Sequence, residues 1–158
     1  PGIEESYPDT LSGEEIPVFI ACEKADAYRQ TMHSDELIIT ADTIVWLDGL
    51  VMGKPEDEED ARRMLRCLSG KTHQVITGVC LTTTEFQKSF ATVTDVTFAE
   101  LTEEEIDYYV QKYKPMDKAG SYGIQEWIGF VGVEGITGSY FNVMGLPIQR
   151  LYKELKKL

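Results

Sequence analysis

The apolar segment from Leu37 to Leu47 constrains the fold of this chain more than any other stretch. It is rich in β-branched residues, and its length and composition are typical of a strand that is buried in a sheet. Asp48-Gly49 follows it as a turn signal, and residues 50–52 (Leu-Val-Met) can return as a short second strand. The segment therefore predicts a sheet strand followed by a hairpin turn.

Helical and strand-like periods alternate along the rest of the chain. Ser12 with Glu15, and Thr102 with Glu105, match the S/T-x-x-E pattern of a helix-capping box. We expect helices at about residues 12–29, 56–68, 102–114 and 147–158. We expect a hairpin of strands at about residues 72–83 and 90–98, and one or two more strands between residues 120 and 145. This alternation predicts an α/β or α+β domain with a mixed sheet.

The composition limits the functions that the chain can have. It contains 15 Lys and Arg against 27 Asp and Glu, a net charge of −12, which disfavours nucleic acids and anionic membranes because binding there depends on basic residues. A phosphate would need a local basic cluster, together with a divalent cation.

The three cysteines, Cys22, Cys67 and Cys80, form no CxxC pair, which argues against a disulfide scaffold or a zinc site and fits a reducing cytoplasm. The sequence contains no linker, and none of its apolar runs approaches the roughly 18 residues that a membrane span needs. We therefore expect one soluble cytoplasmic domain over residues 1–158.

Asp42 is a carboxylate inside the apolar run 38–45 (Ile-Ile-Thr-Ala-Asp-Thr-Ile-Val). Burying an unpaired carboxylate is costly, so a metal, a lysine or several amide donors must lie near it. Such a residue suits metal binding or the activation of a water molecule. The alternative is that Asp42 caps the end of the strand by bonding to backbone amides. The spacing alone does not separate these two interpretations.

Two lysines occupy positions where a structural role and a phosphate-binding role compete. Lys24 lies four residues after Ile20, which puts an ammonium on the expected core-facing stripe of the first helix. Lysine stems often extend to the surface from such positions, which is the alternative. Lys54 lies in Gly53-Lys54-Pro55, a stiff turn just before the second helix. It could address a phosphate or be an ordinary solvated turn residue.

The segment from Asp117 to Gln125 gathers charges, small residues and an amide. Gln125 offers both a donor and an acceptor, which reading the edge of a nucleobase requires. Asp117 and Lys118 could equally form a structural ion pair, and the glycines of the segment could simply serve turns.

Familiar catalytic motifs are absent from the sequence. It contains no G-x-x-x-x-G-K-[ST] loop, no G-x-G-x-x-G after a strand, no H-E-x-x-H and no G-x-S-x-G elbow. His73 is expected in a turn where a strand begins, with no nucleophile for it to activate. Any functional assignment therefore depends on the weaker signals in combination.

Taken together and in this order, the signals resemble the Maf family of nucleotide pyrophosphatases. The matching stretches cover essentially the whole chain, and chance agreement of so many ordered blocks is improbable. They are Gly2-Ile3-Glu4-Glu5, Ala21-Cys22-Glu23-Lys24-Ala25, Ala41-Asp42-Thr43-Ile44-Val45, Gly53-Lys54-Pro55, Leu68-Ser69-Gly70-Lys71-Thr72-His73-Gln74-Val75, Thr94-Asp95-Val96-Thr97-Phe98, Asp117-Lys118-Ala119-Gly120-Ser121-Tyr122-Gly123-Ile124-Gln125, Gly138-Ser139-Tyr140 and Gly145-Leu146-Pro147.

The resemblance implies an α/β fold with a mixed twisted sheet, flanking helices and two lobes around a central cleft, like that of the inosine triphosphatases. It implies a cut between the α and β phosphates of a nucleoside triphosphate, giving the monophosphate and pyrophosphate. It also implies a divalent cation (Mg²⁺, Mn²⁺ or Co²⁺), a small-molecule nucleotide substrate and a homodimer.

The resemblance assigns catalytic roles to individual residues. Asp42 matches the family's proton acceptor, and Glu5 matches an additional acidic residue. One or both of these carboxylates are expected to hold the cation. Lys24 and Lys54 match the lysines that face the phosphates, and Lys118 is a further positive group for them.

Substrate selection and one departure from the family complete the expectations. Thr43 and Gln125 match positions linked to base selection, and a glutamine there is typical of the branch that acts on dTTP and UTP. The sequence contains no Ser-x-Ser-Pro-Arg-Arg segment, with which family members open, so that this piece either precedes Pro1 or is missing from the chain. This departure supports an alternative function, a nucleotide-binding module that regulates cell division without needing hydrolysis.

Overall fold

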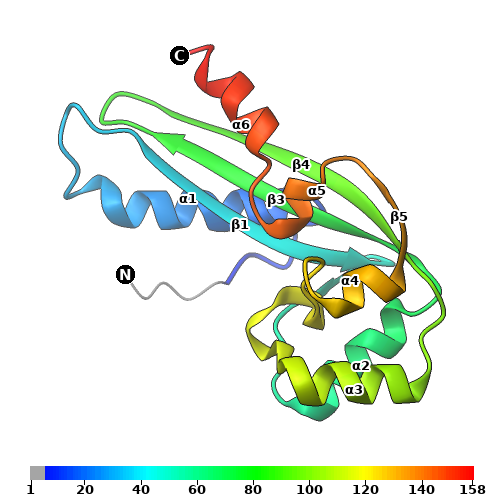
Figure 1. Ribbon diagram of the computed structural model, residues 1–158. Helices are drawn as coiled ribbons and strands as arrows, with labels where there is room; N and C mark the ends of the chain where they lie inside the picture. Colours follow the sequence, from blue (N-terminus) through cyan, green and yellow to red (C-terminus); the bar gives the residue numbers. More distant parts are fainter. Residues whose placement is uncertain (1–5) are drawn as a thin grey trace.

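The computed structural model describes residues 6–158, and within them five strands form one sheet in the order β2-β1-β3-β4-β5 (Figure 1). The strands are β1 (Ile38–Leu47), β2 (Leu50–Met52), β3 (Thr72–Thr82), β4 (Gln87–Phe98) and β5 (Val133–Thr137). All pairings between the described strands are antiparallel, whereas we expected a mixed sheet. Short connections account for two of these pairings, because residues 48–49 join β1 to β2 and residues 83–86 join β3 to β4, and turns this short link antiparallel neighbours.

Six α-helices accompany the sheet in the described part of the chain. They are α1 (Glu15–Arg29), α2 (Glu58–Leu68), α3 (Glu103–Tyr113), α4 (Trp127–Gly132), α5 (Tyr140–Met144) and α6 (Ile148–Leu155), with two 3₁₀ turns at Pro115–Asp117 (η1) and Ala119–Ser121 (η2). The segment between residues 120 and 145 thus contains one strand, within the expected range, and two short helices.

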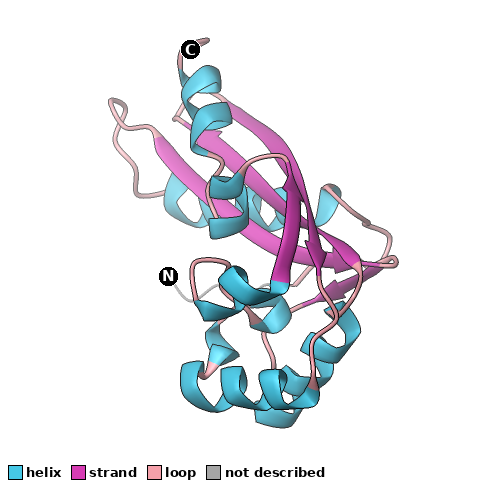
Figure 2. Cartoon of the chain, turned by 45° about the vertical axis from the view of Figure 1, so that its right-hand side comes forward, coloured by secondary structure: helices cyan, strands magenta, loops and turns pink. Residues whose placement is uncertain are grey.

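The helices divide between the faces and one end of the sheet. In β3, Ile76 packs with α1 and Val79 packs with α6, and because these residues point to opposite faces, α1 and α6 cover opposite sides of the sheet. The helices α2, α3 and α4, with η1 and η2, gather at one end as a separate helical lobe (Figure 2). The expected architecture, a sheet with flanking helices in two lobes, is confirmed.

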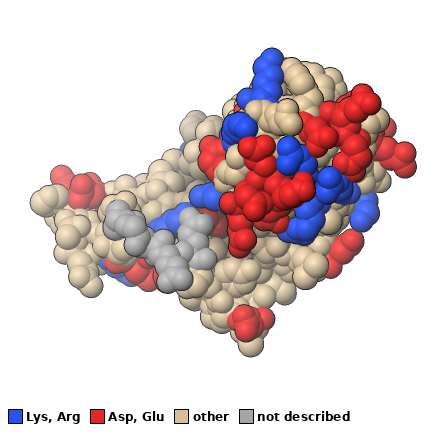
Figure 3. All heavy atoms as spheres, turned by 90° about the horizontal axis from the view of Figure 1, so that it is seen from below, with Lys and Arg blue, Asp and Glu red and all other residues tan. Residues whose placement is uncertain are grey.

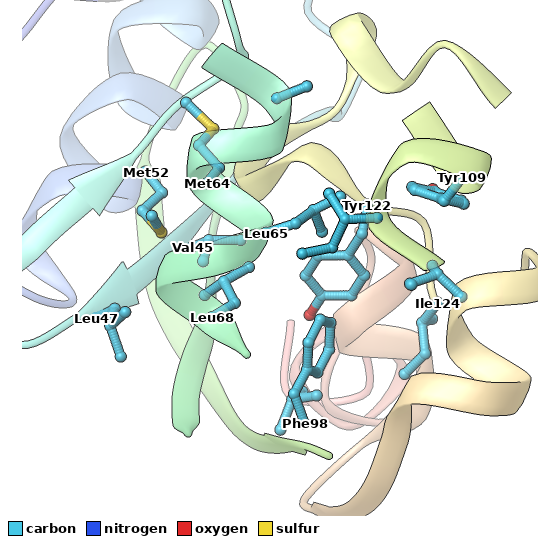
Figure 4. Packing of buried hydrophobic residues seen from close by; sticks show 14 of the residues in the cluster. Val45, Leu47, Met52, Met64, Leu65, Leu68, Phe98, Tyr109, Tyr122 and Ile124 are labelled. Atoms are coloured by element: carbon cyan, nitrogen blue, oxygen red, sulfur yellow. The ribbon is translucent and has the colours of Figure 1, made fainter. Parts of the chain in front are cut away.

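The largest hydrophobic cluster lies where the helical lobe meets the sheet (Figure 4). Val45 of β1 and Phe98 of β4 pack there against Leu65 and Leu68 of α2 and Tyr109 of α3, and all five are buried. The apolar period predicted for residues 56–68 therefore forms the core-facing stripe of α2. This packing fixes the helical lobe against the sheet and so fixes the space between them.

The two predicted capping boxes have different outcomes. At α3, the Thr102 hydroxyl accepts from the Glu105 backbone N–H and the Glu105 carboxylate accepts from the Thr102 N–H, so the box is confirmed. At α1, only the Ser12 N–H to Glu15 bond forms, and the helix begins at Glu15. Gly13, with a φ of 54°, is left-handed, and a helix cannot run through that conformation.

His73 lies at the start of β3 as predicted, but it is a buried strand residue and not part of the turn. Gly70, with a φ of 69°, makes the turn before the strand begins. His73 Nε2 lies 2.6 Å from the Tyr122 hydroxyl, and burial lowers the pKa of His73 to about 4. The histidine is therefore neutral near pH 7 and supports the segment that carries Tyr122.

Charged side chains of both signs are interleaved over the outer face of the helical lobe (Figure 3). Arg62 Nε lies 2.8 Å from Asp107 Oδ1, and Arg66 Nε lies 2.9 Å from Glu103 Oε1. Both pairs connect α2 to the N-terminal half of α3. Both ion pairs therefore lie within the helical lobe and hold α2 against α3.

Candidate active site

A cavity of about 590 Å³ lies between the helical lobe and the edge of β1. Distant parts of the chain line it, from α1 and β1 to the loops around η1 and the end of α5. Six of the seven residues proposed from the sequence lie in its wall: Lys24, Asp42, Thr43, Lys54, Lys118 and Gln125. The seventh, Glu5, lies outside the described residues.

The cavity follows the edge of β1. β2 pairs only with Val45–Leu47, so within the described chain no strand covers the outer side of β1 from Ile38 to Ile44. Neighbouring strand residues point to opposite faces, so Asp42 faces α1 while Thr43 faces the end of α5. Both residues nevertheless line the same cavity, because the cavity lies at the edge of the sheet, where side chains from both faces can reach it.

Asp42 and Lys24 form an ion pair in the cavity wall. Lys24 Nζ lies 3.3 Å from Asp42 Oδ1 and 3.4 Å from the Ala41 carbonyl oxygen. Only 8% of the Asp42 side chain and 27% of the Lys24 side chain are exposed, so the ammonium offsets the cost of burying the carboxylate. Asp42 is the fifth of the ten residues of β1, so the alternative that it caps the strand's end is wrong. The Lys24 side chain points to this carboxylate, so it does not simply extend into solvent, which was the alternative for this residue.

Gly78 allows α1 to lie close enough for this pair to form. It is the residue of β3 directly opposite Asp42. A Cβ atom at Gly78 would lie 2.3 Å from the Val18 backbone nitrogen, so any side chain there would push α1 away. Two residues farther along β3, Cys80 Sγ lies 3.3 Å from Cys22 Sγ, which shows the same close approach. A glycine inside an apolar strand is the sequence signal for it.

The loop of Lys54 is attached to the segment that carries Lys118. The Gly120 N–H donates to the Gly53 carbonyl oxygen at 3.1 Å. Gly120 has a φ of 70°, and a Cβ atom there would lie 2.7 Å from Val45 Cγ2, so both the backbone conformation and the packing favour glycine. These contacts bring the exposed Lys54 and the partly buried Lys118 to one cavity.

Lys118 makes the ion pair that we considered as an alternative and also lines the cavity. Its Nζ lies 3.3 Å from Asp117 Oδ1 and 4.0 Å from Glu126 Oε2. The hydrogen bond from Lys118 lowers the pKa of Asp117 below its ordinary value. Because 76% of the Asp117 side chain is exposed, this contact is weak and leaves the ammonium available to a stronger anion.

Thr43 and Gln125 occupy different sides of the cavity. The Thr43 hydroxyl lies 2.9 Å from the Thr77 hydroxyl and 3.3 Å from the Gly145 carbonyl oxygen, so Thr43 is held in one orientation. Gln125 is exposed in the turn before α4, and its side chain lines the cavity. One polar side chain is thus fixed and the other is presented by a loop.

Sequence reasoning missed several residues around the cavity. Tyr7 lines it, and nothing in the neighbouring sequence indicates this. Thr77 supports Thr43, and its signal is a hydroxyl in the otherwise apolar β3. Tyr109 bonds to the turn that carries Gln125, although it reads as one apolar position of the α3 stripe.

The arrangement has the chemistry expected of a polyphosphate site. Three lysines and a buried carboxylate face one cavity, so anionic oxygens can be bound beside a group that can accept a proton. Within residues 6–158, no three His, Cys, Asp or Glu side chains gather closely enough to hold a metal ion by themselves. Over the same residues, no helix has the length and apolar character that crossing a bilayer would need.

Comparisons with known proteins agree with this description. The family model described as Maf-like protein matches residues 1–158. The chain is 80% identical over 158 residues to a protein of Phocaeicola vulgatus named dTTP/UTP pyrophosphatase, a match that covers 100% of this chain and 82% of that protein. Proteins of the same name from Bacteroides fragilis and Porphyromonas gingivalis are 71% and 54% identical over 158 residues, covering 82% and 79% of their own lengths and 100% and 99% of this chain. The chain therefore belongs to the Maf family.

Proposed function

We propose that this protein hydrolyses dTTP and UTP to the nucleoside monophosphate and pyrophosphate. The relatives named above support the reaction and the substrates, since each carries the name dTTP/UTP pyrophosphatase. The observation on this chain that carries the proposal is the Lys24–Asp42 ion pair in a cavity shared with Lys54, Lys118 and Gln125. A carboxylate beside several ammonium groups is suited to activating water against a polyphosphate.

Asp42 acts as the general base of the reaction. It accepts a proton from a water molecule whose oxygen attacks the α-phosphorus. The bond from that phosphorus to the bridging oxygen breaks, and pyrophosphate leaves with the electron pair. Lys24, whose Nζ lies 3.3 Å from Asp42 Oδ1, remains next to the reacting phosphate and stabilises the charge that develops on its oxygens.

Lys54 and Lys118 bind the departing phosphates. Both line the cavity, and the Gly120–Gly53 backbone bond holds their loops together. Their local positive charge overcomes the net charge of −12, because short-range interactions in a partly enclosed site outweigh distant, screened charges. Binding energy from these lysines positions the α-phosphate against Asp42.

A divalent cation, Mg²⁺, Mn²⁺ or Co²⁺, is proposed to accompany the substrate. Mg²⁺ commonly binds through one or two carboxylates together with substrate phosphates. Asp42, a buried carboxylate in the cavity wall, fits this donor set, and Glu5 is the second candidate ligand. When bound, the cation would supply charge neutralisation at the phosphoryl oxygens.

Thr43 and Gln125 select the base. The Gln125 amide can donate to and accept from the edge of a pyrimidine ring. The Thr43 hydroxyl is fixed by Thr77, so it presents a constant polar contact at the other side of the cavity. Two contacts on opposite sides of a base discriminate better than one, because a wrong base leaves buried polar groups unpaired.

The test is pyrophosphate release from a panel of canonical and modified nucleoside triphosphates with Mg²⁺, Mn²⁺ or Co²⁺. We expect dTTP and UTP to be preferred, and Asp42→Asn to lower turnover about 10²–10⁴-fold. Asp35→Asn is the matched control, since Asp35 is an exposed aspartate, and it should leave turnover unchanged. Near-normal turnover by Asp42→Asn would remove Asp42 from its role.

The same assay separates an enzyme from the regulatory alternative. A pure binding module would show thermal stabilisation by nucleotide without releasing pyrophosphate, and the names of the relatives give no support to that alternative. A homodimer and a cytoplasmic location are further proposals: the first rests on the family resemblance, and the second on three cysteines that form no disulfide. Sedimentation of the purified protein and fractionation of the cells test them.

A further inference from the structure

The turn that presents Gln125 is held at both ends by one buried hydroxyl. Gln125 lies in the four-residue turn Gly123–Glu126, which the Glu126 N–H closes by donating to the Gly123 carbonyl oxygen at 3.0 Å. The Gly123 N–H donates to the Tyr109 hydroxyl at 3.0 Å, and that hydroxyl donates to Glu126 Oε1 at 2.5 Å. Tyr109 thus bonds to the first and the last residue of the turn whose interior carries Gln125.

Tyr109 is a rigid support. It has no exposed surface, and it lies in the middle of α3, where its ring stacks on Tyr113 with 5.0 Å between centroids. Burial and the bond to Glu126 raise the pKa of Tyr109, so it remains protonated and continues to donate. A side chain this enclosed has little conformational freedom, so the position of the turn follows the position of α3.

Glu126 connects this turn to the phosphate side of the cavity. While Oε1 accepts from Tyr109, Oε2 lies 4.0 Å from Lys118 Nζ. A Cβ atom at Gly123 would lie 2.8 Å from Lys118 Cε and 3.0 Å from Glu126 Oε1, so Gly123 leaves the space in which these side chains meet. One carboxylate therefore links the base-reading turn to a phosphate-binding lysine.

We propose that Tyr109 and Glu126 are positioning residues that determine base selectivity by fixing Gln125 and Lys118 relative to each other. The inference rests on the proposed function. Tyr109 lies outside the cavity wall and acts only through the turn, whereas Gln125 and Lys118 line the cavity. Without the hydroxyl, the Gly123 N–H and the Glu126 carboxylate lose a buried partner, and the turn can adopt other positions. The amide of Gln125 then meets different bases with similar affinity.

The experiment compares Tyr109→Phe with the wild type and with Tyr113→Phe. We would measure kcat and KM for dTTP, UTP, CTP and GTP, and the melting temperature of each variant. We expect Tyr109→Phe to lower the ratio of kcat/KM for dTTP over CTP about tenfold, through KM more than kcat. Tyr113→Phe removes a hydroxyl from the same helix, outside the cavity wall, and should keep the ratio. A lower melting temperature with an unchanged ratio would mean that Tyr109 is only structural and would overturn the inference.

Glu126 provides an independent test if Tyr109→Phe does not fold. Glu126→Gln keeps an oxygen that can accept from the Tyr109 hydroxyl, so we expect the ratio of kcat/KM for dTTP over CTP to stay within about twofold of the wild type. Glu126→Ala loses both contacts and should also relax selectivity.

Gln125→Ala separates failure of this inference from failure of the proposed function. If Gln125→Ala relaxes selectivity but Tyr109→Phe and Glu126→Ala do not, the positioning role is wrong and base reading by Gln125 stands. If the wild type shows no preference among the four substrates, both the proposed selectivity and this inference are wrong.

Discussion

The protein contains two kinds of ion pair that differ in their surroundings. Lys24 and Asp42 meet at 3.3 Å in the wall of the cavity, with 27% and 8% of their side chains exposed. Arg66 and Glu103 meet at 2.9 Å on the outer face of the helical lobe, with 45% and 62% exposed. The second pair is shorter, yet water screens it, whereas the first is largely withdrawn from water and acts more strongly on nearby charges.

This difference shows that the net charge of the chain does not describe the local environment of its charged groups. The net charge of −12 is spread over the whole chain, whereas Lys24, Lys54 and Lys118 all line one cavity, which is the local basic cluster that the proposed function requires. What distinguishes the cavity pair is its environment: it joins a helix to a strand edge that no strand in residues 6–158 covers, beside a cavity of about 590 Å³. The following changes test this contrast.

Lys24→Met should have the largest effect. It keeps most of the side-chain stem and removes the ammonium, so we expect kcat/KM for dTTP to fall about 10²–10³-fold. Lys153→Met is the control, because Lys153 is exposed on α6, and it should retain full activity. Steady-state pyrophosphate release measures both. A loss of less than about threefold for Lys24→Met would contradict a role at the phosphate.

Gly78→Ala tests whether close packing of α1 brings the pair together. The new methyl group would lie 2.3 Å from the Val18 nitrogen, so α1 must shift, and overpacking of this kind costs about 1–3 kcal/mol. We expect a lower urea midpoint together with reduced activity, since Lys24 moves with α1. Gly135→Ala introduces the same methyl group into β5, where nothing lies within 4 Å, and should be close to neutral. Equal stability of the two variants would show that the approach at Gly78 is not needed.

Glu154 tests a third kind of ion pair, in which a buried carboxylate has exposed basic partners. It is buried on α6 and interacts with Arg150, Lys88 and Lys157, and these partners lower its pKa from 4.5 to about 2. Because the folded pKa is depressed, this stabilisation is complete above pH 4.5 and is lost as the pH falls toward 2.

We therefore expect Glu154→Gln to destabilise the protein at pH 7 and to approach the wild type as the pH falls below 4.5. Urea unfolding at a series of pH values measures the difference. A difference between the two proteins that does not change from pH 7 to pH 3 would contradict the ion-pair explanation. Activity at pH 7 and low temperature should be unaffected, because Glu154 lies outside the cavity wall.

Arg66→Gln should have the smallest effect. The exposed pair with Glu103 contributes on the order of 0–1 kcal/mol, and added salt reduces this further. We expect a melting temperature within a few degrees of the wild type and unchanged kcat/KM. If Arg66→Gln impaired hydrolysis as much as Lys24→Met, the distinction between the two kinds of pair would be lost.

Local patterns in the sequence predicted much of the fold. The i, i+3, i+4, i+7 stripe of α2 and the Thr102–Glu105 box of α3 depend on neighbours within one or two turns, and both are confirmed. The start of α1 was wrong because Gly13 adopts a left-handed conformation that the capping pattern does not reveal. The mixed sheet was expected from element order, which does not specify how strands pair across long connections.

The candidate site could be predicted only in part. Asp42 was visible as a charge inside an apolar strand, but its partner Lys24 lies 18 residues away, and only the packing of α1 brings the two together. Tyr109 looked like an ordinary apolar position, because a hydroxyl at the end of a buried ring gives no signal in a helical period. Contacts of this kind depend on how elements pack, and residue spacing does not encode them directly.

A double-mutant cycle on Asp42 and Lys24 tests the central claim most directly. The measurement is kcat/KM for pyrophosphate release from dTTP by the wild type, Asp42→Asn, Lys24→Met and the double variant. If the two residues act as one unit around the reacting phosphate, the double variant should lose no more than about threefold beyond Asp42→Asn alone. Losses that multiply would mean that the residues act independently, and full activity in either single variant would place the reaction elsewhere in the protein.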